Sequence, residues 1–473
     1  MVTLAVRSGA FSRAVATAPR PLAAERHEQW HGIYRGKQKI GYSHRVRTPT
    51  ADGFTVESDT SMWLSLMGSS QAVRTRLSAE TDRSLVLRSF AFRLRSGTID
   101  FEVAGKVHDG VVDLDSATLG KQTIRIPPDV PLALSDTLVD LVGNERLETG
   151  RSFRYTIFDP ASAAPASVTL KVGPLEPLTL PSGERSAYRI DQRFQGTSTR
   201  LWVDAEGNVL KEEGPLGLAI VREIDGRVAM QGVSAGAGAD LAAAAAIPVT
   251  RAIATPRDAA HLRLRVARAP SSATFSFPPR QRLDGDRLVI EREDSRGFRS
   301  YELPEGDERF REELRATPFL QIDDATIRRA AREAVGNERD AERAARSLVD
   351  WVYRTLAKVP TISVPNAVQV LAERRGDCNE HAVLFAALAR AAGIPAKIAS
   401  GTVYMPPDGD GAGAFYYHAW NEVWLGEWVA VDPTFGQFPA DATHVKLIEG
   451  GPENDLSLAG MIGELAVEVE DFG

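Results

Sequence analysis

A single cysteine begins the segment of this 473-residue chain that is best suited to chemistry. Cys378 follows Gly376 and Asp377, and it precedes an alanine-rich apolar run that ends at Gly393. This pattern predicts a helix with Asp377 as its N-cap and Glu380 as the capping-box partner. Backbone N–H groups and the helix dipole stabilise a thiolate at a helix N-terminus. We therefore expect a lowered pKa and a reactive thiol at Cys378.

A nucleophilic cysteine needs a base, and the base needs an orienting group. His418 lies in a strand-like run over 415–424, and Asp432 ends a second such run over 428–432. We expect His418 at the start of the first strand, and a tight hairpin that brings His418 and Asp432 together at its open end. The sequence therefore predicts a triad of Cys378, His418 and Asp432, with the backbone N–H of Cys378 as one oxyanion donor.

Three motifs in this order carry a family resemblance: the Gly-Asp-Cys helix, the His-Ala-Trp strand and the Asp-Pro-Thr strand end. Together they resemble the transglutaminase-like superfamily, especially its bacterial cysteine-peptidase-like members, over about 360–445 with weaker helical support from about 320. The resemblance implies a papain-like α+β core with the cysteine helix packed on an antiparallel sheet. It implies Cys378 as nucleophile, His418 as general base and acid, and Asp432 as orienting carboxylate.

The implied reaction is acyl transfer through a thioester on an amide bond of a protein or peptide. Water as the second nucleophile would make the enzyme a peptidase or amidase, and an amine acceptor would make it a protein-glutamine transamidase. The resemblance to bacterial members favours hydrolysis. The alternative is a non-catalytic binding scaffold in which the β-rich region binds an envelope or protein partner, because a fold alone does not establish an activity.

Other features of the sequence argue for simpler interpretations. Cys378 and His381 share a helical face, but two ligands do not make a metal site, so we expect no metal and no cofactor. His381 is expected to pack beside the site. The loop over 406–413 is similar to part of a calcium loop but lacks the later glutamate, which favours a solvated loop.

Composition narrows the class of protein. The net charge of −7 argues against nucleic acid as a partner. The single cysteine excludes an intramolecular disulfide, and no apolar run reaches the ~18 residues of a membrane span. Arg7 and Arg13 interrupt any signal-peptide core, so we expect either a cytoplasmic protein or one exported with a signal that is missing here. The compartment and the oligomeric state do not follow from the sequence.

The predicted fold class is α+β, with the papain-like transglutaminase core preceded by a large antiparallel β-rich domain. We expect a flexible leader over 1–29, a β-rich domain over 30–235 with half-barrel character, a linker and small β module over 236–319, and the catalytic domain over 320–473. Short alternating runs predict the strands. Helical periodicity begins at about 323 and continues along one apolar face, made of Ala341, Ala345, Leu348 and Val352.

Overall fold

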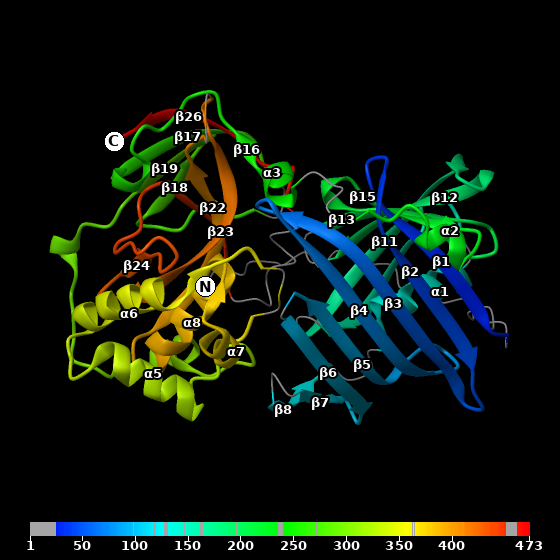
Figure 1. Cartoon of the computed structure of the whole chain (residues 1–473), viewed down its shortest axis with the longest axis horizontal. Helices are drawn as coiled ribbons and strands as arrows, with labels where there is room; N and C mark the ends of the chain where they lie inside the picture. The colour runs from blue at the N-terminus through cyan, green and yellow to red at the C-terminus, as the bar shows by residue number, and fades with distance from the viewer. Residues whose placement is uncertain are drawn as a thin grey trace, which may run out of the picture.

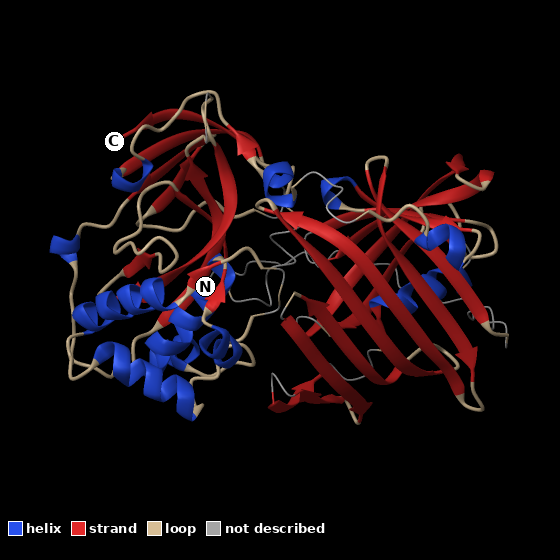
Figure 2. Ribbon diagram, viewed as in Figure 1, coloured by secondary structure: helices blue, strands red, loops and turns tan. Residues whose placement is uncertain are grey.

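The computed structural model of the chain describes residues 25–473 apart from 98, 117–119, 127–130, 146, 161–163, 195–196, 235–239, 270–272, 362, 364, 408, 410 and 451–460. The described residues form a β-rich part and a mixed α+β part that lie side by side (Figures 1 and 2). The predicted fold class is therefore confirmed. The predicted leader lies mostly outside the described residues, and the first strand begins at His27.

The β-rich part is one 15-stranded sheet with the order β8-β7-β6-β5-β4-β3-β2-β1-β15-β14-β13-β12-β11-β10-β9. All its pairs are antiparallel except β9 with β10. The strands are β1 (His27–Arg35), β2 (Gln38–Pro49), β3 (Gly53–Leu66), β4 (Ser69–Asp82), β5 (Leu87–Ser96), β6 (Ile99–His108), β7 (Val111–Ser116), β8 (Gly120–Arg125), β9 (Leu132–Leu134), β10 (Ser152–Asp159), β11 (Ala164–Leu180), β12 (Gly183–Phe194), β13 (Thr197–Val203), β14 (Val209–Glu213) and β15 (Leu218–Glu223).

Alternation of apolar and polar residues builds this sheet. In β6, Ile99, Phe101 and Val103 are buried, whereas Asp100 and Glu102 are exposed, as expected for a strand with one face on a core. The sheet curves around helix α1 (Ser135–Asn144), which carries Asp140 toward two arginines of β2 (Figure 1). The helix thus fills part of the concave side that the half-barrel prediction implied.

The α+β part contains two further sheets, with the orders β16-β23-β22-β25, where β24 pairs with β23, and β18-β19-β17-β26. A short pair, β20-β21, precedes the cysteine helix. The strands are β16 (Ile247–Pro248), β17 (His261–Arg268), β18 (Gln281–Asp284), β19 (Arg287–Glu291), β20 (Ala357–Lys358), β21 (Arg375–Gly376), β22 (Ala396–Met405), β23 (Ala414–Trp424), β24 (Trp428–Val431), β25 (His444–Glu449) and β26 (Ala466–Phe472). The remaining helices are α2 (Gly226–Met230), α3 (Leu241–Ala245), α4 (Arg311–Leu314), α5 (Ala325–Val335), α6 (Ala341–Thr355), α7 (Ala367–Glu373) and α8 (Cys378–Ala391).

Helix α8 lies at the centre of the α+β part. All ten residues from Glu380 to Ala389 are buried, which is the pattern of a helix covered on every side. Helices α5, α6 and α7 pack on one side of α8, and strands β22 and β23 pack on the other (Figure 1). Helix α6 has the predicted apolar face, since Ala341, Ala345, Leu348 and Val352 are all buried.

The segments that join the two parts make specific contacts. Phe319 is buried in the apolar core of the β-rich sheet, and the Gln71 side chain near the start of β4 donates to the carbonyl of Pro360 at 2.7 Å. The four-stranded sheet combines β17, β18 and β19 with the distant β26, so the small β module shares its packing with the C-terminus of the chain. The exact division into domains stays a prediction.

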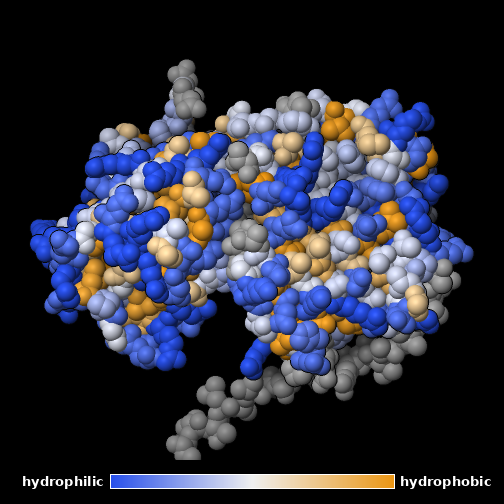
Figure 3. Space-filling view, turned by 60° about the horizontal axis from the view of Figure 1, so that its bottom comes forward, coloured by the Kyte–Doolittle hydropathy of each residue, from blue (hydrophilic) through white to orange (hydrophobic). Residues whose placement is uncertain are grey.

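Hydrophilic side chains cover most of the face seen in Figure 3, and hydrophobic ones are scattered among them over both parts. Among the helices that the structure describes, none has both the length and the apolar character needed to cross a bilayer.

The packing of α6 gives a first testable prediction. We expect Leu348→Ala, at a fully buried position, to lower the free energy of unfolding by about 2–5 kcal/mol, because it removes apolar contacts and leaves a cavity. Leu283→Ala, at a side chain of β18 that is 41% exposed, should change it by less than about 0.5 kcal/mol. Urea unfolding of both variants measures the difference, and equal midpoints would contradict the packing described for α6.

Candidate active site

The N-terminus of α8 is built as the sequence predicts. Cys378 is the first residue of the helix, and the Asp377 carboxylate accepts a hydrogen bond from the backbone N–H of Asn379 at 3.0 Å. Glu380 completes the capping box by accepting from the N–H of Asp377 at 2.8 Å. These bonds satisfy N–H groups that have no partner within the helix, so they fix the point where the chain turns into α8.

The residue before the cap must be a glycine because of a close approach. A Cβ at Gly376 would lie 2.3 Å from the Cβ of Glu380, which is well inside van der Waals contact. The Glu380 carboxyl is buried and also accepts a hydrogen bond from the Ser363 hydroxyl. Burial and the neighbouring Asp377 carboxylate raise the pKa of Glu380 well above its usual value. The Gly-Asp-Cys motif is thus a packed turn as well as a chemical signature.

The Cys378 thiol does not have the lowered pKa that its position at a helix N-terminus predicts. Burial, followed by the negative charge of Asp377, raises the pKa of the thiol well above its ordinary value. A hydrogen bond from the backbone N–H of Ala419 acts in the opposite direction but does not outweigh them. The expected resting thiolate is therefore wrong, and the thiol needs a base that removes its proton.

Strand β23 carries the histidine. His418 lies in the middle of β23 and not at its start, which corrects the predicted position. The hairpin itself is as predicted: β23 pairs with β24 in the register Asn421 with Val431 and Trp424 with Trp428. Asp432 follows directly after β24, and His418 Nε2 lies 2.8 Å from Asp432 Oδ2. The hairpin therefore brings the two side chains together despite the shifted start.

The Asp432 carboxylate is fully buried and has four hydrogen-bond donors. Its Oδ1 accepts from the backbone N–H groups of Thr434 and Phe435 at 2.6 and 3.1 Å. Its Oδ2 lies 2.8 Å from His418 Nε2 and 3.0 Å from His444 Nε2. Burial alone would raise the pKa of Asp432, but the two histidines outweigh it, and the pKa lies far below its usual range.

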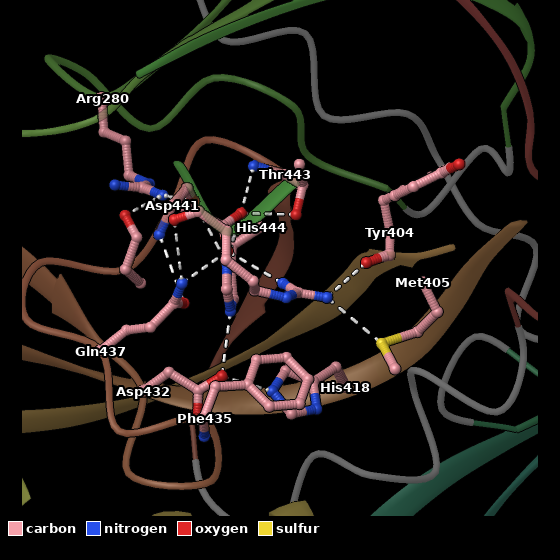
Figure 4. Close-up of polar contacts among 12 residues, drawn as sticks. Arg280, Tyr404, Met405, His418, Asp432, Phe435, Gln437, Asp441, Thr443 and His444 are labelled. Atoms are coloured by element: carbon pink, nitrogen blue, oxygen red, sulfur yellow. Dashed lines mark hydrogen bonds and ion pairs between the residues drawn. The ribbon is translucent and has the colours of Figure 1, made fainter. Parts of the chain in front are cut away.

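His444 is a second histidine that the sequence analysis did not identify (Figure 4). It begins β25 and is fully buried. Its Nε2 contacts Asp432, and its Nδ1 lies 3.1 Å from the carbonyl oxygen of Asp441 and 3.4 Å from its Oδ1. Both ring nitrogens thus face acceptors, and only the imidazolium form can donate from both. Burial lowers the pKa of His444, but the bonds to Asp432 and Asp441 outweigh it and raise the pKa above its ordinary value.

The charges continue one step further to Arg257. Its Nη1 donates to Asp441 Oδ2 at 2.9 Å, and burial, which would raise the pKa of Asp441, is outweighed by His444 and Arg257, so this pKa is lowered. His444 lies between the two carboxylates. His418 contacts the first, Asp432, and Arg257 contacts the second, Asp441. With His444 protonated, Asp432, Asp441, His444 and Arg257 sum to zero charge, which makes their burial tolerable.

Aromatic rings hold the plane of the His418 imidazole. Phe435 stacks on it with ring centroids 4.9 Å apart and an interplanar angle of 11° (Figure 4). Trp420 lies near parallel to the same ring at 6.2 Å. With Nε2 committed to Asp432 and the ring plane held, His418 Nδ1 is the nitrogen that is left for chemistry.

One buried amide ties the cysteine helix to the histidine strand. The Asn421 side chain in β23 donates to the carbonyl of Ala382 in α8 at 3.0 Å and to the carbonyl of Lys397 in β22 at 3.2 Å. Because Asn421 lies three residues after His418 and Ala382 lies four after Cys378, these bonds fix the helix against the sheet close to both side chains.

Three residues of this network could also serve as metal ligands. His418, Asp432 and His444 offer ligand atoms within 4.8 Å of one another. The Nε2 atoms of His418 and His444, however, both lie within hydrogen-bond distance of Asp432 Oδ2. Protons on these two nitrogens are sufficient to complete both contacts. His381 packs beside the site, as expected, with its Nδ1 2.6 Å from the carbonyl oxygen of Asp377.

Some of this network could have been suspected from the sequence. The chain contains eight histidines, and His444 follows Asp432 by only twelve residues. The Asp441-Ala-Thr-His444 spacing also resembles a local turn. What the sequence does not provide is the placement of β25 beside β22, which brings His444 to the triad.

The comparisons with known proteins agree with the resemblance described above. Residues 328–433 match the model of the transglutaminase-like superfamily, and this segment contains all three residues of the predicted triad. The chain therefore carries a transglutaminase-like domain. None of the curated proteins compared with the chain matches it.

Several solved structures are similar over part of the chain. One is a candidate cysteine protease from Cytophaga hutchinsonii, 17% identical, with a TM-score of 0.29, over 45% of this chain and 86% of the other. Another is a β-barrel-like protein of a domain of unknown function from Brucella abortus, 10% identical, with a TM-score of 0.34, over 44% and 97%. A third is a candidate protease from Parabacteroides distasonis, 11% identical, with a TM-score of 0.20, over 80% and 70%.

The raised pKa of His444 gives a prediction about stability. A group with a raised folded pKa contributes stability that is fully present below its unfolded pKa of ~6.5 and is lost as the pH rises through the folded value. We therefore expect His444→Gln to lower the free energy of unfolding more at pH 6 than at pH 9, by at least about 1 kcal/mol. Urea unfolding at both pH values measures this.

The matched control is His261→Gln, at a half-exposed histidine of β17. It should lower stability by less than about 0.5 kcal/mol at both pH values. A loss in His444→Gln that is the same at pH 6 and pH 9 would mean that His444 is neutral in the folded protein.

Proposed function

We propose that this chain, which carries a transglutaminase-like domain, is a cysteine-dependent amide-bond enzyme that works by acyl transfer through a thioester. Cys378 is the nucleophile, His418 the general base and acid, and Asp432 the orienting carboxylate. The observation that carries the proposal is the buried His418–Asp432 hydrogen bond of 2.8 Å. Ala419, the residue that follows His418 in β23, donates its backbone N–H to the Cys378 sulfur.

The first step forms the bond between Cys378 Sγ and the amide carbonyl carbon. Because burial and Asp377 keep the thiol protonated, the proton passes to His418 Nδ1 as the sulfur attacks. The carbonyl electrons move to oxygen, and the backbone N–H of Cys378 at the start of α8 is one donor for that oxyanion. The imidazolium that forms is stabilised by the Asp432 carboxylate.

The second step breaks the bond between the carbonyl carbon and the amide nitrogen. The proton on His418 passes to the leaving amine, and the acyl group remains on Cys378 as a thioester. His418 then takes a proton from the second nucleophile as it attacks the thioester carbonyl. The bond between the carbonyl carbon and Cys378 Sγ breaks, and the proton on His418 returns to the sulfur, which restores the thiol. We propose water as this nucleophile, so that the enzyme is a peptidase or amidase. An amine would make the same site a protein-glutamine transamidase.

His444 has a supporting role in this proposal. It contacts the same Asp432 oxygen, Oδ2, as His418 does, and its positive charge keeps the carboxylate ionised in a fully buried site. His444 does not reach the reacting atoms, so it is a positioning residue that acts through Asp432. The pair of histidines explains how a buried carboxylate can orient the base and remain charged.

Alkylation of the only cysteine tests the link between thiol and base. We expect iodoacetamide to label Cys378 of the native chain at neutral pH at least about tenfold faster than it labels His418→Ala, because the thiol has a raised pKa and depends on the base for its proton. The rate of the His418→Ala variant should rise toward that of the native chain as the pH passes well above ~8.5. Mass spectrometry of the modified chain gives the rates.

Alkylation of His261→Ala serves as the matched control and should match the native chain. Equal rates for His418→Ala and the native chain across the pH range would show that His418 does not act on the Cys378 thiol, and would contradict the triad.

An activity assay tests the reaction itself. We expect the full chain to release peptides or ammonia from a panel of unfolded proteins and glutamine-containing peptides, and Cys378→Ala to lower the rate by about 10³-fold or more. Asp432→Asn should lower the rate of a folded, labelled enzyme by a comparable order. Incorporation of a labelled amine in place of hydrolysis would establish the transamidase instead. A folded chain with an unreactive Cys378 and no turnover would favour the binding scaffold.

A further inference from the structure

The β-rich part contains a cavity of about 330 Å³ between the inner face of its sheet and helix α1. This volume lies within the range of small-molecule sites. At the ~30 Å³ that one water occupies, it has room for roughly ten non-hydrogen atoms. The cavity is distant in sequence from the triad, and every residue that lines it precedes Ile224.

Part of the cavity lining is apolar. Leu138 of α1, Ile157 of β10 and Leu201 of β13 line it and are 5%, 2% and 6% exposed. These side chains belong to the apolar core between α1 and strands β10 to β14. An apolar molecule would therefore extend that core, and such burial is the main favourable contribution to binding of an apolar ligand.

Two carboxyl groups stand together in the same lining. Asp136 is the second residue of α1, and Glu212 is in β14. Both are half-buried, and the adjacent Ser135 is exposed. Burial and the negative charge of Asp136 raise the pKa of Glu212 to about 7. Two partly buried acids that line one cavity and repel each other are costly unless a cation joins them.

The described part of the chain supplies no such cation to Glu212. No described side chain makes a hydrogen bond or an ion pair with its carboxyl group, whereas the nearby Glu213 pairs with Lys211 at 2.5 Å. The one arginine in the cavity lining, Arg45, is engaged with Asp140. The cavity thus combines apolar and polar walls with an acidic group, Glu212, that has no counter-ion among the described side chains.

We propose that this cavity binds a small primary amine with an apolar body, whose ammonium group lies between Asp136 and Glu212 and whose body packs against Leu138, Ile157 and Leu201. The ammonium supplies the positive charge and the N–H donors that the two carboxyl groups lack. This function is separate from the proposed catalysis and does not depend on it.

The test is isothermal titration calorimetry of the full chain with three probes of matched length: n-octylamine, 1-octanol and octanoate. We expect n-octylamine to bind at least tenfold more tightly than 1-octanol, and octanoate to bind more weakly than either. The Cys378→Ala variant should give the same affinities, because the cavity is remote from the thiol. Equal binding of the amine and the alcohol, or tighter binding of octanoate through Arg45, would overturn the proposal.

Variants place the binding in the cavity. Glu212→Gln combined with Asp136→Asn should weaken n-octylamine binding at least tenfold and leave 1-octanol binding unchanged. The matched control is Glu213→Gln on the outer face of β14, where strand alternation points the side chain away from the cavity; it should bind n-octylamine as the native chain does. An unchanged melting temperature of the double variant shows that it is folded. Unchanged amine affinity in the folded double variant would rule out this site.

Discussion

The buried Asp432 carboxylate is the group on which the rest of the catalytic core depends. A negative charge with no access to water is tolerated only when donors surround it, and here two backbone N–H groups and two histidines do so. The turn after β24 supplies the first two donors, β23 supplies His418, and β25 supplies His444. The two carboxylate oxygens of Asp432 therefore fix the relative positions of β23, β25 and the turn after β24.

The same constraint explains why the network continues beyond the triad. His444 can bring a charge to Asp432 only if its own charge is balanced, and Asp441 and Arg257 balance it in turn. Arg257 comes from a segment far from the catalytic helix in sequence, and its guanidinium also lies 4.3 Å from the centroid of the Phe435 ring that stacks on His418. The region before the family match thus contributes directly to the surroundings of the proposed base.

Contacts between residues close in the sequence were enough to predict the cysteine helix. The position of His444 and the burial of Cys378 depend on contacts between distant residues, which the sequence does not reveal. The Asp377 cap, the Glu380 partner and the apolar run specify α8 by contacts within a few residues, and the turn after Trp424 specifies the hairpin. His444 could not be placed, because its role requires β25 to pair with β22, and no short-range pattern encodes that pairing. The pKa of Cys378 was predicted in the wrong direction for a related reason: the helix terminus is visible in sequence, but the burial that outweighs it arises only from packing.

The position of strand β26 has a consequence for how the chain assembles. Strand β26 (Ala466–Phe472) pairs with β17 (His261–Arg268), about two hundred residues earlier in the chain, and its valines are part of the core that also holds Tyr404 and Val445. During synthesis the β-rich sheet can form from successive hairpins as they emerge, since most of its strands pair with their neighbours in sequence. The four-stranded sheet of the α+β part must wait for residues 466–472 to leave the ribosome. A nascent chain that has not yet exposed β26 would therefore carry the cysteine helix without a completed core, so full assembly of the α+β part would follow only after β26 has emerged.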